Sequence, residues 1–285
     1  MRLTVLKALV LGALLLLAGC TATTTGDDIE LADGPLAGKF VWHDLITDDA
    51  SRAMRFYGAL FGWQFERTER LDEPYWIIRK DGRYVGGIVE LREGNDEEYS
   101  RWLGYLSVPD VDEASRLTEQ AGGSVVVAPL DLDIARAAAV SDPQGAVLGL
   151  LRVRGGDPVD TEGSESGFVI WNELLASDTA AAAAFYRDLA GVVPETIPRR
   201  GGEYTLLRGS GRERAGILKR PNDDIEPLWL THFGVDDPAA AVQSASELGG
   251  KVLLAPSADF RESSMALVED PGGAVLALTR FDATE

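Results

Sequence analysis

The chain has 285 residues and a formal net charge of −19, from 46 acidic and 27 basic side chains. This charge argues against nucleic acid as a partner and against electrostatic binding to anionic lipid. The length is sufficient for two domains, each with a core of its own, and the single cysteine excludes an internal disulfide.

Residues 1–20 have the pattern of a lipoprotein signal peptide. Two basic residues precede an apolar run from Ala8 to Leu17, which is too short to span a bilayer as a stable helix. The run ends in Leu-Ala-Gly-Cys, which resembles a bacterial lipobox. In proteins with that motif the cysteine receives lipid and becomes the mature N-terminus, so we expect lipidation at Cys20. An uncleaved signal anchor is the alternative.

Residues 21–38 are small and polar, which is typical of a flexible tether. Thr21 stands where an aspartate would resemble the inner-membrane retention signal of enteric bacteria. We therefore expect a lipid-anchored protein of the cell envelope, on the outer membrane and facing the periplasm if the cell is Gram-negative. The membrane is then a partner only through the lipid on Cys20.

A stretch from Trp42 to Gly62 recurs from Trp171 to Gly191, at a constant offset of 129 and with eight identical positions among 21. Each copy predicts a short strand, an aspartate N-cap, an amphipathic helix and a glycine that ends the helix. A period of this length is too long for a solenoid and indicates duplicated domains.

The first predicted domain spans residues 39–153. Its opening strand and helix are followed by a hairpin through Asp81-Gly82, a strong turn signal. A second module begins near Trp102, and its helix starts at Asp110. The predicted strands are 40–47, 75–80, 84–91, 102–108, 125–128, 136–141 and 146–151.

Residues 154–166 are rich in glycine and charge and predict a linker. The second predicted domain spans residues 167–281 and repeats the plan. Each domain is thus strand–helix–strand–strand–strand, twice. Because each helix has one apolar face, the helices should cover the outside of curved sheets. The predicted strands here are 168–175, 204–208, 215–219, 229–235 and 274–279.

Three motifs carry a family resemblance: FYGALFGW at residues 56–63, Val-Pro-Asp at 108–110, and DPQGAVLGL at 142–150. Their counterparts AFYRDLAG, GVDDP and DPGGAVLAL occur in the second domain. In combination they resemble the vicinal oxygen chelate superfamily of glyoxalases, bleomycin-resistance proteins and extradiol dioxygenases. The resemblance implies an α+β fold of two tandem domains that share an interface. Each would be a pair of βαβββ modules forming a curved, cavity-enclosing mixed sheet with helices outside.

Enzymes of this superfamily usually hold a divalent metal with His and Glu side chains from the inner strands. This resemblance places the ligand positions at residues that cannot bind metal, apart from Glu90 in the first domain. His43 is one residue out of register, so it should face away from the cavity as a structural histidine. We therefore expect no metal and no cofactor. The non-ligating residues are Trp42, Leu103 and Gly149, and then Trp171, Lys219, Leu230 and Ala277.

The same register places a tryptophan and a carboxylate on the cavity face of each domain. Such pairs could bind an apolar or cationic small molecule by stacking and a charge-assisted hydrogen bond. The alternative is that the tryptophans fill the space left by a lost metal. The predicted ligand-binding residues are Trp42, Asp44, Glu90, Trp102, Tyr105, Trp171, Glu173, Trp229 and His232.

The leading hypothesis is an envelope-anchored protein that binds small organic molecules without a metal. One alternative is a lyase- or isomerase-type enzyme that uses Asp44, Glu173 or His232 as general acid or base. Another is a structural or partner-docking lipoprotein with collapsed cavities. An open cavity of ligand size beside Trp42 or Trp171 would separate a binder from a scaffold.

Overall fold

The computed structural model describes residues 29–281, except 69–73, 92–98, 133, 162–164, 200–201 and 259–260. The predicted signal peptide, Cys20 and residues 21–28 lie outside the described residues. Among the residues that are described, no helix has the length and apolar character needed to cross a bilayer.

The first repeat forms an eight-stranded mixed sheet in the order β2-β3-β4-β1-β5-β8-β7-β6. β1 pairs with β4 in parallel, and β5 pairs with β8 in parallel. The pairs β2–β3, β3–β4, β6–β7 and β7–β8 are antiparallel. The elements are β1 (Phe40–Thr47), α2 (Ala50–Phe61), β2 (Gln64–Thr68), β3 (Tyr75–Lys80), β4 (Arg83–Glu90), β5 (Ser100–Ser107), α3 (Val111–Gln120), β6 (Ser124–Asp131), β7 (Ala135–Ser141) and β8 (Val147–Val153).

The second repeat forms an equivalent sheet in the order β10-β11-β12-β9-β13-β16-β15-β14. The α+β fold of paired βαβββ modules is therefore confirmed. Its elements are β9 (Val169–Ala176), α4 (Thr179–Ala190), β10 (Val193–Arg199), β11 (Gly202–Gly209), β12 (Arg212–Lys219), β13 (Leu228–Val235), α5 (Pro238–Glu247), β14 (Lys251–Leu254), η3 (Arg261–Ser263), β15 (Met265–Glu269) and β16 (Val275–Arg280).

The helix ends follow the sequence signals. Asp49 caps α2 by accepting a hydrogen bond from Arg52 N at 2.7 Å, and Gly62 ends the helix in the left-handed conformation with φ 73°. Asp178 caps α4 in the same way, accepting from Ala181 N at 2.9 Å. The duplicated strand–helix motif is therefore confirmed in both repeats.

Besides the inner strand β15, three edge strands add to the predicted elements: β2, β10 and β14. They are largely exposed, so their sequences lack the apolar alternation that identifies a half-buried strand. β10 also contains Pro194 and Pro198, which a sheet tolerates only at its edge. Position in the sheet, rather than local pattern, makes these segments strands.

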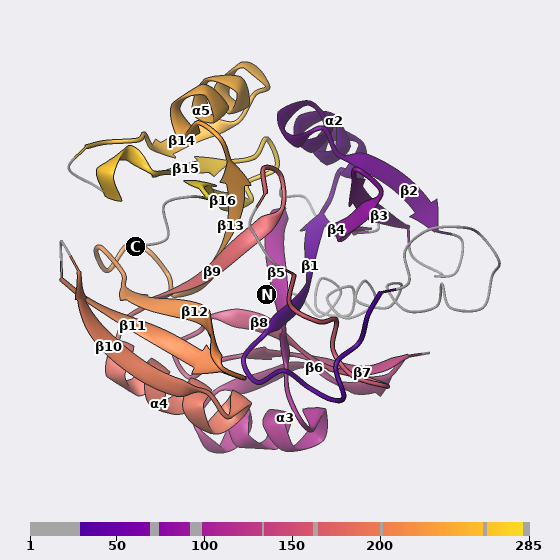
Figure 1. Cartoon of the computed structure of the whole chain (residues 1–285), viewed down its shortest axis with the longest axis vertical. Coiled ribbons are helices and arrows are strands. Elements are labelled where there is room, and N and C mark those ends of the chain that lie inside the picture. The colour runs from indigo at the N-terminus through magenta and orange to yellow at the C-terminus, as the bar shows by residue number, and fades with distance from the viewer. Residues whose placement is uncertain are drawn as a thin grey trace. The chain divides into compact units, whose positions relative to one another are not determined.

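The chain folds into two compact units that do not coincide with the two repeats. Unit 1 contains residues 29–43, 103–161 and 172–229, and unit 2 contains residues 44–102, 162–171 and 230–281. In unit 1, α3 contacts α4, and in unit 2, α2 contacts α5 (Figure 1). Each unit therefore combines one βαβββ module from each repeat.

The hydrophobic cores follow the units. In unit 1, Leu106 and Leu148 of the first repeat join Leu189 and Ile217 of the second. In unit 2, Phe56 and Tyr57 of the first repeat join one core with Phe233 and Leu276 of the second. The expectation that each repeat encloses its own core is thus wrong, because each module packs its helix against a module of the other repeat. The boundaries 39–153 and 167–281 describe the sequence repeat.

The described parts of the predicted tether and linker also differ from the flexible segments expected. Ala32 N donates to the backbone oxygen of Asp157 at 2.8 Å, and Val159 N donates to that of Glu30 at 2.9 Å. Neither segment has apolar periodicity, so the sequence pattern does not reveal that they pair.

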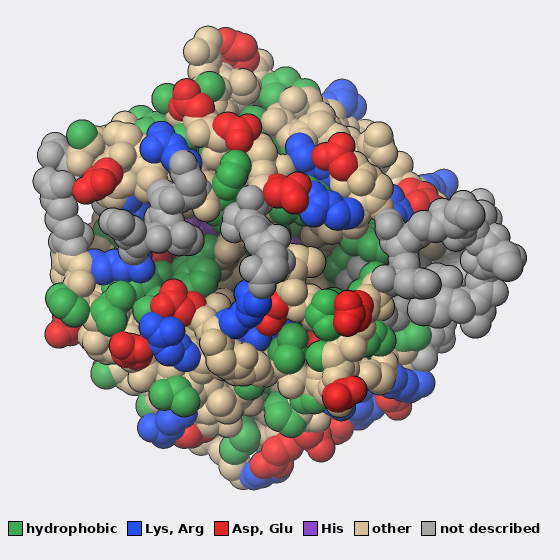
Figure 2. Space-filling view, in the orientation of Figure 1, with side chains coloured by type: hydrophobic (Ala, Val, Ile, Leu, Met, Phe, Trp, Pro, Cys, Tyr) green, Lys and Arg blue, Asp and Glu red, His purple; other side chains and the backbone are tan. Residues whose placement is uncertain are grey.

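On the face drawn in Figure 2, acidic and basic side chains are interspersed.

Candidate functional site

A buried carboxylate of β1 is hydrogen-bonded to a tyrosine of β3. Asp44, which is 0% exposed, accepts a bond at Oδ1 from the Tyr75 hydroxyl at 3.0 Å. Gly87 on β4 is the register partner of Asp44, and a Cβ there would lie 1.9 Å from the Tyr75 hydroxyl oxygen. A glycine at this position is therefore what leaves room for the tyrosine beside the carboxylate.

The second repeat has the same arrangement in unit 1. Glu173 on β9 is 1% exposed and is the register partner of Gly216 on β12. A Cβ on Gly216 would lie 1.7 Å from the hydroxyl oxygen of Tyr204. The sequence predicted the two carboxylates but missed the two tyrosines, although Tyr75 and Tyr204 recur at the same offset of 129 as the rest of the repeat.

The positions of the family's last glutamate ligand are closed to a long side chain in the first repeat. Gly149 on β8 is the register partner of Tyr105 on β5. The Tyr105 ring covers it so closely that a Cβ on Gly149 would lie 2.1 Å from Tyr105 Cδ1. In the second repeat, His232 is the register partner of Ala277, and its Nδ1 lies 3.0 Å from Thr279 Oγ1.

The other predicted ligand positions fit a metal no better. Glu90 is half-buried, and its Oε1 accepts a hydrogen bond from Ala50 N at 3.0 Å, at the start of α2. Leu103 and Leu230 are buried. Among the described residues, no group of three or more His, Cys, Asp or Glu side chains is placed to hold a metal ion. The residues present do not fit the divalent metal that the fold implies.

His43 has the structural role that its register predicts. It is 4% exposed, and its Nε2 lies 2.8 Å from Asn172 Oδ1. Its ring stacks on Phe40. Burial lowers the pKa of His43 to about 4, and the hydrogen bond to Asn172 offsets part of that shift. The histidine is therefore neutral at pH 7.

Two of the predicted cavity tryptophans lie in the hydrophobic cores instead. Trp102 Nε1 donates to the hydroxyl oxygen of Tyr57 at 2.9 Å in unit 2. Trp229 Nε1 donates to that of Tyr186 at 2.9 Å in unit 1. Both tyrosines belong to the helices, so these tryptophans pack beneath helices rather than line the cavity that the sequence predicts for them.

The predicted ligand-binding residues divide between the two units. Trp42 is buried at 4% exposed, whereas Trp171 is half-buried. The structure thus brings Asp44 together with Tyr75, but it does not gather all nine predicted residues in one unit. Unit 1 holds Trp42, Tyr105, Glu173 and Trp229, and unit 2 holds Asp44, Glu90, Trp102, Trp171 and His232.

Unit 1 also contains a small apolar hollow. Its walls are too close to admit a water molecule, so it is a gap in the packing. It is lined by Gly38, Phe40, Leu106, Tyr186, Ala190, Val192, Leu207, Ala215 and Trp229.

Comparison with known proteins decides the family. A sequence profile of the Glyoxalase/Bleomycin resistance protein/Dioxygenase superfamily matches residues 169–278. A Mycobacterium tuberculosis protein named "Putative glyoxylase CFP32" is 30% identical over 252 residues, which cover 84% of this chain and 93% of that protein. The chain belongs to this superfamily. The anthracycline biosynthesis protein DauV of Streptomyces sp. is also 30% identical, over 83% of this chain and 91% of its own length.

Solved structures of superfamily members share the fold. The Mn(II)-bound glyoxalase from Novosphingobium aromaticivorans matches with a TM-score of 0.56 at 17% identity, over 87% of this chain and 85% of its own. The 2,3-dioxygenase LapB from Pseudomonas sp. KL28 matches with a TM-score of 0.54 at 13% identity, over 87% and 93% of the two chains. At these identities the likeness concerns the fold alone.

Proposed function

We propose that this superfamily member binds small organic molecules without a metal, and that lipid on Cys20 anchors it in the cell envelope. The observation that carries the metal-free part is the Tyr105 ring over Gly149. A glutamate in place of Gly149 would have to displace that ring. With Trp42 and Leu103 at two further ligand positions, the described part of the first repeat offers too few donors for a tight site, which needs three or four protein ligands.

The two buried carboxylates supply the polar part of the proposed binding. Tyr75 donates a hydrogen bond to Asp44 within the fold. A ligand with an apolar body and a cationic or hydrogen-bond-donating group would complement Asp44 and Glu173. The relative named for anthracycline biosynthesis supports an organic ligand, since that name concerns the synthesis of a small organic molecule.

The second candidate is an enzyme of lyase or isomerase type. It is favoured by the same hydrogen bond, because a carboxylate and a tyrosine in contact are a common acid–base pair. Asp44, Glu173 or His232 would then move a proton on the bound substrate. A structural or partner-docking lipoprotein is the third reading, and absence of any bound molecule would favour it.

Native mass spectrometry of the protein purified from its own cell envelope tests binding. We expect a bound organic mass, and we expect Asp44→Asn or Glu173→Gln to reduce its occupancy at least tenfold. The exposed residues Asp236 and Glu119 provide matched controls as Asp236→Asn and Glu119→Gln, which should retain the ligand. Full occupancy in all variants would overturn the role of the carboxylates. Turnover of the identified molecule that is lost in Asp44→Asn would favour the enzyme.

Detergent partitioning tests the anchor. We expect wild-type protein in the detergent phase, and Cys20→Ser protein either unprocessed or in the aqueous phase. A variant that is processed and still partitions with detergent would refute lipidation at Cys20.

A further inference from the structure

We propose that residues 29–39 form a strap that is locked onto unit 1 through Asp157 and Asp160, and that this lock holds the anchored protein close to its membrane. The distance argument rests on the lipidation of Cys20 that belongs to the proposed function. The lock itself does not depend on lipidation.

The strap pairs through its backbone with the segment that follows β8. Three backbone hydrogen bonds join them: Ala32 N to Asp157 O at 2.8 Å, Asp157 N to Gly34 O at 3.1 Å, and Val159 N to Glu30 O at 2.9 Å. These bonds surround an antiparallel bridge between Leu31 and Pro158. The pairing gives backbone N–H groups protein acceptors in place of water.

Two glycines allow the close approach of the strap. A Cβ on Gly156, whose φ is +125°, would lie 1.8 Å from the backbone oxygen of Ala32. A Cβ on Gly209 would lie 1.9 Å from the backbone oxygen of Ala37. A side chain at either position would push the strap away, so both glycines fit a strap that lies directly on unit 1.

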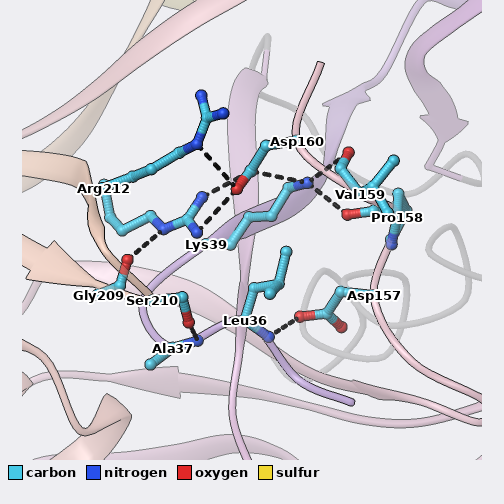
Figure 3. Close-up of polar contacts among 11 residues, drawn as sticks. Leu36, Ala37, Lys39, Asp157, Pro158, Val159, Asp160, Gly209, Ser210 and Arg212 are labelled. Carbon is cyan, nitrogen blue, oxygen red and sulfur yellow. Dashed lines mark hydrogen bonds and ion pairs between the residues drawn. The ribbon is translucent and has the colours of Figure 1, made fainter. Parts of the chain in front are cut away.

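Polar side chains hold the second half of the strap. Asp157 is 0% exposed, and its Oδ2 accepts a hydrogen bond from Leu36 N at 2.6 Å. Ser210, in the turn between β11 and β12, accepts from Ala37 N at 3.0 Å. The strap is therefore bonded to two different segments of unit 1 (Figure 3).

Asp160 is the centre of the lock. Its Oδ1 and Oδ2 accept hydrogen bonds from Arg214 Nη1 at 2.6 Å and Nη2 at 2.9 Å. Lys39 Nζ lies 3.2 Å from Asp160 Oδ1, and Arg212 Nε lies 3.5 Å from Oδ2 (Figure 3). One carboxylate thus joins the end of the strap to two arginines of β12.

Because these charged groups are partly or fully buried, their ion pairs are important for the stability of unit 1. The Arg214 side chain is only 5% exposed, so its guanidinium requires a negative partner. Burial lowers the pKa of Lys39, and the charge of Asp160 offsets part of that shift. Burial raises the pKa of Asp160, but the bonds from Arg214 and Lys39 outweigh it and leave the pKa lowered. Removing Asp160 would take from Arg214 and Lys39 the carboxylate that bonds both of them.

The lock shortens the free tether. Between Cys20 and the strap there are eight residues, 21–28. At about 3.5 Å per extended residue they reach about 30 Å at most, whereas a tether of residues 21–38 would reach roughly 60 Å. The strap therefore keeps its face of unit 1 within about 30 Å of the membrane. The lipid surface is the partner of that face.

Hydrogen exchange of the full chain tests the lock. We expect slow exchange at the amides of Ala32, Leu36 and Ala37, and at least tenfold faster exchange at all three in Asp160→Ala. Ser210→Ala should accelerate Ala37 alone, which keeps the test valid if Asp160→Ala unfolds unit 1. Glu195→Ala, which removes a surface ion pair with Arg208 in the same unit, should change none of them. Fast exchange in the wild type would overturn the lock.

Energy transfer tests the distance. A donor on Thr161→Cys of the lipidated protein, bound to phosphatidylethanolamine–phosphatidylglycerol vesicles with a headgroup acceptor, should transfer efficiently. Transfer should fall at least twofold when Asp160→Ala is added, and unchanged transfer would overturn the distance setting. If Cys20→Ser protein still binds the vesicles, the anchoring and the distance setting both fail. Slow exchange of the strap amides in that variant would still support the lock.

Discussion

Tyr186 donates a hydrogen bond of 2.8 Å to Asp142 Oδ2, although the two residues come from different sequence repeats. Both side chains are buried. Asp142 Oδ1 accepts from Gln144 N and Ala146 N, so the same carboxylate also fixes the turn before β8. With the bond from Trp229 to the tyrosine oxygen, unit 1 contains a buried Trp–Tyr–Asp chain that joins the repeats.

Unit 2 contains the equivalent Trp–Tyr–Asp hydrogen-bond chain, with the roles of the two repeats exchanged. Tyr57 of the first repeat donates to Asp270 of the second at 3.0 Å, and Trp102 donates to Tyr57 at 2.9 Å. Burial, followed by the charge of Asp270, raises the pKa of Tyr57 well above 10. The tyrosine is therefore protonated at neutral pH and can donate to Asp270.

We expect Tyr186→Phe to destabilise the protein by about 2 kcal/mol, because it leaves a buried carboxylate oxygen and an indole N–H without a partner. Tyr57→Phe should cost a similar amount. Tyr84→Phe is the control, since Tyr84 lies only partly buried beside Arg79. Urea denaturation measures all three, and a loss below about 0.5 kcal/mol for Tyr186→Phe would show that this Trp–Tyr–Asp chain does not hold the two repeats together in unit 1.

The interleaved cores lead to a prediction about cleavage. A protease site introduced at residues 162–164 would cut the chain between the repeats, yet each core contains residues from both sides of the cut. We expect the two fragments to co-elute on size exclusion in native buffer and to separate only in denaturant. Fragments that separate in native buffer would show that each repeat folds alone, contrary to the cores.

The sequence predicted most of the inner strands, the helices and their caps, because these elements combine apolar periodicity with capping residues. It could not predict which modules share a core. The apolar face of α4, for example, has no signal that distinguishes packing on its own repeat from packing beside Asp142. That choice is made by tertiary contacts such as the bond from Tyr186.

The candidate site was predictable only in part. Strand alternation identified Asp44 and Glu173 as inward-facing, but Tyr75 lies on a different strand, and its approach to Asp44 depends on the register of β3, β4 and β1. The strand position of Trp229 predicted a place in the cavity, whereas its indole N–H donates a hydrogen bond to the Tyr186 hydroxyl in the core. Pairing between strands therefore carries information that a single strand lacks.

His43 should make stability depend on pH. Its folded pKa of about 4 lies below the ordinary histidine value of 6.5, so the unfolded chain binds more protons between these values. Stability should therefore fall as pH drops from 6.5 to 4, by about 3 kcal/mol in total. Denaturation curves at pH 7 and pH 4.5 measure the loss, and His43→Gln should make it smaller. An equal loss in that variant would assign the pH dependence to other groups.

A further prediction concerns the packing of Tyr105 against Gly149. A methyl group at Gly149 would overlap the Tyr105 ring, so Gly149→Ala should cost about 1–3 kcal/mol, as overpacking does. In a Tyr105→Leu background the same change should cost clearly less, because the ring is gone and the two sites are coupled. Equal costs in both backgrounds would show that the ring does not restrict this position.

The packing of Tyr105 on Gly149 also leads to a prediction about metal content. The purified protein should carry no stoichiometric Ni, Zn, Fe or Mn, and a chelator should leave its melting temperature unchanged, since a bound metal would stabilise the folded state. Gly149→Glu in the Tyr105→Leu background should still bind none, because Trp42 and Leu103 remain at two other ligand positions. Elemental analysis checks both proteins. About one transition metal per wild-type chain, lost in His232→Ala, would instead place a ligand at His232 and refute the metal-free function.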